Sequence, residues 1–229
     1  GAFEGFFARQ IAPNLAAWHQ KNALPRDVFR EMGAAGWLGA AWENETIVSY
    51  SGTRETSILA RIARQSPGFA VAVLIVSDLG MNALRLFGGE ALHSRYGNDV
   101  CGGRRLICMA SSENRAGSDA AGIGMTAEKV DGGWVLDGAK AYATNGLISD
   151  LAVVTAVTDP DAERSRRISM FLVDLAADGV SRKRLNKGVW IPSDLTRLTF
   201  SNVFVPGDHL MGEPGRGLSQ VLSAFTHSR

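Results

Sequence analysis

The chain contains little cysteine and no excess of charge of either sign. Cys101 and Cys108 are the two cysteines among 229 residues. They could pair with each other, but they build no disulfide framework, so we expect a reducing, cytoplasmic location. Basic residues number 24 against 23 acidic ones, a net charge of +1. A strong basic excess is typical of proteins that bind nucleic acids or membrane surfaces, so neither partner is expected.

Long apolar runs and paired metal ligands are also missing. The longest apolar run, Phe69 to Val76, is far too short to span a bilayer, so no membrane span is expected. The first residues lack the basic and apolar segments of a signal peptide. None of the histidines has a partner at metal-ligand spacing, which argues against a metal site; they are His19, His93, His209 and His227.

Apolar residues make up 45% of the chain, enough to bury a core. The first hundred residues have helical patterns. We expect helices from Pro25 to Gly33, from about Thr53 to Pro67, and from about Phe69 to Phe87, while residues 42–52 show no period and are predicted as loop.

After Gly102 the pattern changes to short alternating runs that predict strands. They lie at about 105–110, 125–130, 134–137, 151–158, 168–175 and 196–205. Helices followed by strands predict an α+β fold: an all-helical domain over residues 1–101, an antiparallel β-barrel or sandwich over 102–213, and the start of a helical unit over 214–229.

Two stretches carry the residues that suggest chemistry. Residues 108–119 leave a predicted strand and enter a loop rich in small residues and hydroxyls, where backbone N–H groups can hold phosphate oxygens. Residues 138–146 place Tyr142 and Thr144 on one side of a strand end, where a ring and a hydroxyl can meet a flat ligand. Taken singly, each is better explained as an ordinary turn or a half-buried Tyr–Thr pair.

Together with later segments, these stretches resemble the acyl-CoA dehydrogenase family. Residues 112–119, Ser-Glu-Asn-Arg-Ala-Gly-Ser-Asp, are similar to the family's Thr-Glu-Pro-Gly-Ala-Gly-Ser-Asp, and residues 140–146, Lys-Ala-Tyr-Ala-Thr-Asn-Gly, to its second flavin segment. Three later stretches also look like segments of the family and follow in the family's order: residues 187–194, 200–206 and 210–217. The resemblance is specific from about Gly102 onward and loose before it.

The resemblance implies FAD as cofactor and assigns roles by position. Met109, Ser111 and Ser112 would contact the flavin ring system. Gly117 and Ser118 would hold the pyrophosphate, and Ser118 would also touch the thioester ligand. Tyr142 would stack on the ring, with Ala143 and Thr144 bonding near its reactive nitrogen. Thr226 and Arg229 would approach the arm of CoA or of a carrier protein.

The family reaction is α,β-dehydrogenation of an acyl thioester, with electrons passed to an electron-transfer protein. The resemblance also implies a homo-oligomer, a dimer or tetramer, and a catalytic base in a C-terminal bundle beyond Arg229. Two alternatives stay open: a flavin-dependent monooxygenase of the same superfamily, and a non-catalytic chain that needs a second chain for the base.

The sequence departs from the family pattern in two further places. Asn114 and Arg115 replace the family's Pro-Gly, and Arg115 adds a charge to the flavin loop. The family's Pro-Glu-x-x-Gly-Gly stretch is unrecognisable around residues 42–45. The arginines at 164, 166 and 167 and the basic run 182–184 are expected at solvated edges or loops.

Overall fold

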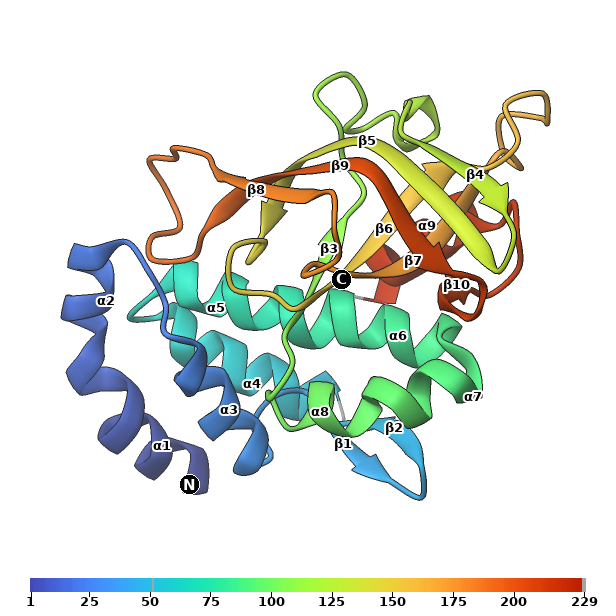
Figure 1. The fold of residues 1–229 in the computed structure, drawn as a ribbon. Helices are drawn as coiled ribbons and strands as arrows, with labels where there is room; N and C mark the ends of the chain where they lie inside the picture. Colours follow the sequence, from blue (N-terminus) through green and yellow to red (C-terminus); the bar gives the residue numbers. More distant parts are fainter. Residues whose placement is uncertain (51, 228–229) are drawn as a thin grey trace.

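The computed structural model describes residues 1–50 and 52–227. Figure 1 shows a layer of helices beneath a sheet, with the chain passing from one layer to the other through β3 (Ile107–Ala110). The α-helices are α1 (Ala2–Phe6), α2 (Leu15–Lys21), α3 (Arg26–Ala34), α4 (Gly52–Ala63), α5 (Pro67–Leu74), α6 (Asn82–Phe87), α7 (Gly89–Leu92), α8 (Asn98–Cys101) and α9 (Gly217–His227). π-Helical segments over Phe7–Ile11, Ile75–Met81 and His93–Gly97 join several of them.

The central helix of the lower layer runs without a break from α5 through Ile75–Met81 into α6. Ser66 caps it by accepting a hydrogen bond from the Phe69 N–H at 3.3 Å, and Pro67 occupies the first turn, where its missing N–H costs nothing. The predicted helix is therefore confirmed. By length and composition Pro67–Phe87 could also cross a membrane, but 61% of its most apolar window is buried, and core helices have the same composition.

The prediction of a loop over residues 42–52 was wrong for residues 42–43 and 46–49, which form strands, while residue 51 lies outside the described residues. β1 (Ala40–Glu43) and β2 (Thr46–Ser49) form an antiparallel hairpin, with Trp42 opposite Ile47. Its two turn residues, Asn44 and Glu45, have φ angles of 49° and 60°. Two consecutive left-handed residues make the tight turn that matches strand twist, and asparagine tolerates this conformation better than most side chains.

The upper layer is one mostly antiparallel sheet. Its remaining strands are β4 (Thr126–Val130), β5 (Gly133–Thr144), β6 (Leu151–Val157), β7 (Ile168–Asp174), β8 (Val180–Arg184), β9 (Leu195–Pro206) and β10 (Leu210–Met211). The order is β10-β7-β6-β4-β5-β9-β8, with β3 parallel to β6. The α+β fold is confirmed. Among the described strands, the path of the sheet ends at β10 and β8, β3 pairs with β6 alone, and no barrel is closed. The predicted domain boundaries at residues 101 and 213 stay predictions.

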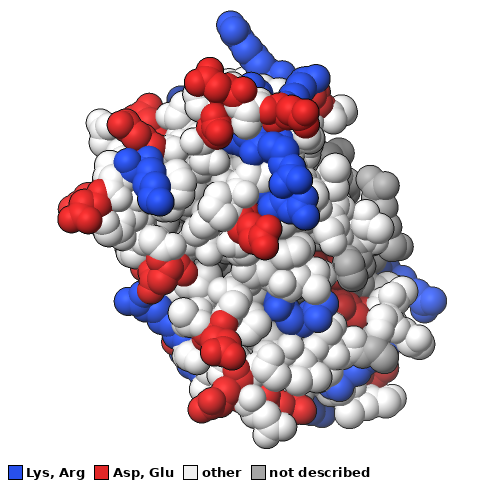
Figure 2. Space-filling model, turned by 90° about the vertical axis from the view of Figure 1, so that its right-hand side faces the viewer, with Lys and Arg blue, Asp and Glu red and all other residues white. Residues whose placement is uncertain are grey.

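The residue types of the strands match their positions in the sheet. Every residue of β6 is buried, and its seven residues are apolar or small except Thr155. The edge strand β8 contains the basic run Arg182-Lys183-Arg184, whose charges suit a strand with one unpaired edge. On the side of the molecule drawn in Figure 2, acidic and basic side chains are interspersed, with no continuous field of one sign.

A buried histidine helps to join the two layers. His209, which follows β9, donates a hydrogen bond from Nδ1 to the Leu172 carbonyl oxygen at 2.9 Å. Its Nε2 lies 3.3 Å from the Tyr96 hydroxyl and 3.3 Å from an Arg95 nitrogen of the helical layer. The Leu172 carbonyl can only accept, so Nδ1 donates to it, and an arginine nitrogen can only donate, so Nε2 accepts on the other side of the ring.

The start of α5 forms a second contact between the layers. The Asn145 amide donates to the Ala72 carbonyl at 2.7 Å. Gly68 lies so close to the loop between β8 and β9 that a Cβ atom there would overlap the Trp190 and Ile191 carbonyls. A glycine is required at this position because a side chain has no space.

Gly68→Ala is therefore expected to destabilise the protein by about 3 kcal/mol, since the new methyl must push the loop backbone away. Gly188→Ala is the matched control, because a Cβ at Gly188 would meet nothing within 4 Å. Urea unfolding of both variants checks this. Equal free energies of unfolding for the two variants would contradict the contact.

Candidate functional site

The structure brings the two sequence-predicted flavin stretches together. The first leaves β3 after Ala110, and the second is the end of β5. The Ala141 N–H donates to the Ser112 carbonyl oxygen at 2.8 Å, so the two segments share a backbone hydrogen bond. Met109 is buried within β3, while Ser111 and Ser112 are partly exposed beyond its end.

A buried ion pair reinforces this junction. Lys140 of β5 is fully buried, and its Nζ donates to a Glu113 carboxylate oxygen at 2.8 Å and to the Ser111 carbonyl at 3.3 Å. The same carboxylate accepts the N–H groups of Gly124 at 2.8 Å and Met125 at 3.0 Å. Lys140 thus ties the flavin loop to the strand that carries Tyr142. The sequence analysis quoted Lys140 but gave it no role.

The environment sets the protonation of both partners. Burial lowers the pKa of Lys140 to about 8, although attraction to Glu113 opposes the shift. Burial alone would raise the pKa of Glu113, but the Lys140 ammonium and two backbone N–H donors outweigh it and the pKa is lowered. A carboxylate held by three donors with a lowered pKa is a poor proton acceptor, so Glu113 is unsuited to be a catalytic base.

Tyr142 sits on a β-bulge. Lys140 pairs with Leu198 and Ala143 with Thr196, so β5 carries one residue more than β9 across this interval. The φ angle of Tyr142 is 62°, a left-handed conformation that is rare for a bulky side chain, and the residue is 58% exposed. An exposed aromatic held in a costly conformation at a strand end is typical of a ligand contact.

Free hydroxyl groups surround this bulge. Within residues 1–50 and 52–227, no hydrogen bond occupies the hydroxyls of Ser111, Ser112, Tyr142 or Thr144. Each of these residues is at least partly exposed. The junction therefore offers several unused donors and acceptors beside one exposed ring. Ala143, by contrast, is buried and paired with Thr196, so it can contribute only backbone groups.

Gly117 and Ser118 lie further along the same loop. Glu113 and Ala116 exchange two backbone hydrogen bonds, at 2.8 and 3.1 Å, which turn the chain back on itself just before Gly117. Both Gly117 and Ser118 are exposed, and a Cβ at Gly117 would meet nothing within 4 Å. The loop beyond them is fixed by an ion pair between Asp119 and Arg164.

Thr226, the predicted substrate contact on α9, forms no hydrogen bond with the predicted flavin residues among the described part of the chain. Thr226 is exposed near the end of α9, and its hydroxyl donates to the Leu222 carbonyl at 2.9 Å within the helix. Arg229 lies outside the described residues. The placement of Thr226 and Arg229 against an acyl-carrying arm stays a prediction.

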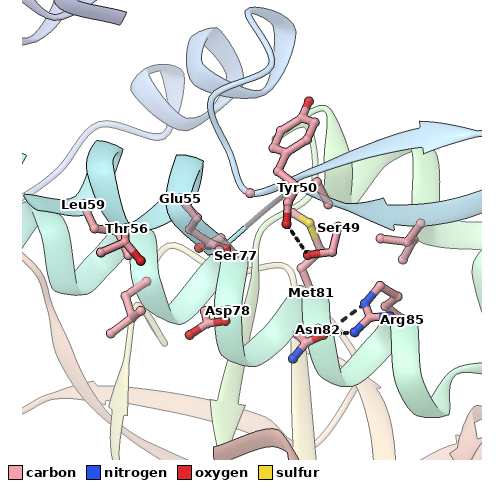
Figure 3. Close-up of a pocket in the computed structure, with 15 residues that line it drawn as sticks. Ser49, Tyr50, Glu55, Thr56, Leu59, Ser77, Asp78, Met81, Asn82 and Arg85 are labelled. Atoms are coloured by element: carbon pink, nitrogen blue, oxygen red, sulfur yellow. Dashed lines mark hydrogen bonds between the residues drawn. The ribbon is translucent and has the colours of Figure 1, made fainter. Parts of the chain in front are cut away.

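A cavity of about 420 Å³ lies in the helical layer, and none of the predicted residues lines it. Figure 3 shows Glu55, Thr56 and Leu59 of α4 on one wall and Ser77, Asp78, Met81, Asn82 and Arg85 on the helix that forms its floor. Burial raises the pKa of the Glu55 carboxyl group. Neighbouring residues of this floor helix face the sheet, where Gly80 packs on Ile107. No local sequence pattern indicates this cavity, because its walls come from β1, β2, α4 and the floor helix, which meet only in the folded protein.

Two profiles of one protein family match this chain. The profile for the acyl-CoA dehydrogenase N-terminal domain matches residues 2–104, and that for the middle domain of the same family matches residues 108–203. The chain belongs to the acyl-CoA dehydrogenase family. The family assignment from the sequence is therefore confirmed.

Relatives and solved structures in the family agree with this. Benzylmalonyl-CoA dehydrogenase of Aromatoleum aromaticum is 32% identical over 99% of this chain and 60% of its own length. The crystal structure of an acyl-CoA dehydrogenase from Geobacillus kaustophilus superposes with a TM-score of 0.93 at 26% identity, over 99% of this chain and 60% of that one.

A glutaryl-CoA dehydrogenase from Mycobacterium smegmatis, solved in complex with FADH2, has the same fold, with a TM-score of 0.87 at 24% identity over 98% of this chain and 56% of that one. The chain spans about 60% of the length of the first family members it matches.

Replacing Lys140 tests the ion pair. Lys140→Met leaves the Glu113 carboxylate without its cation and is expected to cost about 3 kcal/mol. Because the folded lysine releases its proton near pH 8 and the unfolded one near its ordinary value of 10.5, the unfolded chain binds more protons between these values. Wild type should therefore gain stability relative to Lys140→Met as the pH rises from 8 to 10.

Urea unfolding across this pH range measures the difference. Lys129→Met, which removes an exposed lysine of β4, is the control and should show no such trend. A difference between wild type and Lys140→Met that stays constant from pH 8 to 10 would rule out the lowered pKa.

Proposed function

We propose that this chain is the FAD-binding part of an acyl-CoA dehydrogenase, which oxidises the bond between the α- and β-carbons of an acyl-CoA thioester. Family membership supports the reaction class. The observation that carries FAD binding is the junction of the two flavin stretches, where an exposed, bulged Tyr142 stands among unused hydroxyls.

The residues at this junction suit a flat, polar-edged ring. The Tyr142 ring would lie against one face of the flavin, where offset stacking is favourable. The Thr144 hydroxyl and the Ala143 backbone would bond at its edge, and Met109, Ser111 and Ser112 would complete the wall. Gly117 and Ser118 would hold the pyrophosphate, since an exposed glycine lets phosphate oxygens approach the backbone closely.

The protein's part in the chemistry is positioning. FAD, when bound, supplies the acceptor for the hydride that leaves the β-carbon of the acyl chain. The Lys140–Glu113 pair holds the loop and strand in register, so the ring meets a preformed surface. We assign no catalytic base within residues 1–50 and 52–227, because the one carboxylate at the junction, Glu113, is occupied by three donors.

Partners and location follow from the family and the composition. We propose an electron-transfer protein as acceptor, a homo-oligomeric state and a cytoplasmic location. The Ser118 hydroxyl is exposed and has no bond among the described residues, so it could also contact a thioester, together with Thr226 and Arg229. A carrier-protein thioester remains the second substrate form.

The deciding experiment is anaerobic. The protein is purified, its bound flavin is identified by mass, and short-, medium- and branched-chain acyl-CoA compounds are added without oxygen. We expect FAD in the preparation and, when the catalytic base is present, loss of the flavin absorbance on adding substrate. A protein that holds no flavin after reconstitution with FAD would contradict the proposal. Reduction of the flavin by a nicotinamide but not by any acyl-CoA, followed by oxygen consumption when air is admitted, would indicate the monooxygenase instead.

Tyr142→Gly separates binding from stability. Glycine adopts φ of 62° freely, so the strain of about 1 kcal/mol is relieved while the unfolded chain gains a similar entropy. The free energy of unfolding without FAD should therefore change by less than about 1 kcal/mol. FAD affinity should fall about tenfold or more, because the stacking surface is gone.

Tyr142→Phe, which keeps the ring, is the control and should retain FAD. The readouts are FAD titration by fluorescence and urea unfolding of the FAD-free protein. Equal FAD affinity in Tyr142→Gly and wild type would show that the ring does not contact the flavin.

A further inference from the structure

A second pocket lies where the flavin loop meets β5 and β9. It measures about 220 Å³ and is lined by residues 113–115 of the flavin loop, residues 139–141 of β5 and Arg197 of β9. No residue that the sequence analysis assigned to flavin or substrate lines it. The loop position that departs from the family, Arg115, stands at its rim.

The cations around this pocket have no acidic partners. Arg115 and Arg197 are both exposed, and neither side chain forms a hydrogen bond or ion pair within the described part of the chain. Lys183 of β8 pairs directly with Arg197 in the antiparallel register, and it too has no ion pair among the described residues. Like charges directly opposite on neighbouring strands destabilise a sheet, so this pair favours an anion nearby.

Glu113 lines the same pocket but cannot supply that anion. Its Oε1 accepts from the Lys140 ammonium and the Met125 N–H, and its Oε2 accepts from the Gly124 N–H. The Lys140 charge balances the Glu113 charge, so the pair is neutral overall. The two guanidinium groups are left as uncompensated charge at the pocket.

The shape of the pocket also depends on small residues. Ala139 and Ala141 lie on its β5 wall, where larger side chains would fill the hollow. Arg197 stands opposite the bulge, between the residues that pair with Lys140 and Ala143. Arg197 and residues 139–141 next to the bulge therefore line the same pocket.

We propose that Arg115 and Arg197 bind a phosphate group of a ligand in this pocket. A guanidinium presents a planar fork of N–H donors that matches two oxygens of a phosphate, and two such forks suit a group with three or four oxygens. The loop position supports a phosphate, because Arg115 lies two residues before Gly117, where the FAD pyrophosphate is proposed.

Three sources share this chemistry: the diphosphate of FAD, the nucleotide of CoA, and free phosphate. The test measures binding of inorganic phosphate, FAD, CoA and pantetheine by calorimetry at low ionic strength, without turnover. The variants are Arg115→Gly, which restores the family residue, and Arg197→Gln. Arg9→Gln, an exposed arginine of the helical layer without an ion pair among the described residues, is the matched control.

Each pocket variant should weaken binding of the phosphate-bearing ligand about tenfold or more, the loss expected for hydrogen bonds to a charged group. Added salt should weaken binding to the wild type in the same direction. Loss of affinity for FAD, or for CoA but not pantetheine, identifies the source, and loss for inorganic phosphate alone identifies a free-phosphate site.

Unchanged affinity for all four ligands in both variants would overturn the proposal. So would an equal loss for pantetheine, which has no phosphate, since the arginines would then act on something else. Circular dichroism of each variant confirms that the fold is intact. Because no measurement uses dehydrogenation, failure of the proposed function and failure of this site can be told apart.

Discussion

The buried contact between Lys140 and Glu113 is the constraint on which the candidate site depends. An ammonium group with no exposed surface must have its charge balanced and its donors used within the protein. Glu113 and the Ser111 carbonyl meet that need, and both belong to the loop after β3. The loop is therefore held along β5, and the hydrogen bond from Ala141 to Ser112 follows from the same placement.

The Lys140–Glu113 contact helps to hold the end of β5 in a strained backbone conformation. Tyr142 and Asn145 both have positive φ angles, and two segments hold them in place. On one side Lys140 fixes the start of the bulge. On the other, the Asn145 amide bonds to Ala72 of the central helix. The helical layer thus holds the segment that directly follows Tyr142. Strained backbone conformations persist where the surrounding structure holds them, and they cluster at ligand-binding sites. The exposed Tyr142 ring is consistent with such a site.

Much of the fold could be predicted from local pattern. The helices around Val28 and Ile58 have one apolar face, and the strands β6 and β7 are apolar runs bounded by turn residues, so short-range periodicity was enough. The hairpin around Asn44 was missed because two four-residue strands give too short an alternation to recognise. The role of Lys140 was missed because a lysine in an alternating segment usually points to solvent, and only the position of Glu113 reverses that expectation.

By itself, the sequence determined the change from helices to strands, most of the longer helices and strands, the family, and the two stretches that would meet a flavin, because these depend on residue types at short spacing. Tertiary structure alone decided that the two stretches touch, that Glu113 is occupied by three donors, and that Arg115 and Arg197 share one pocket. The physical reason is that hydrogen bonds, burial and uncompensated charge depend on distances between residues far apart in the chain, and only the packing of the sheet on the helices sets those distances.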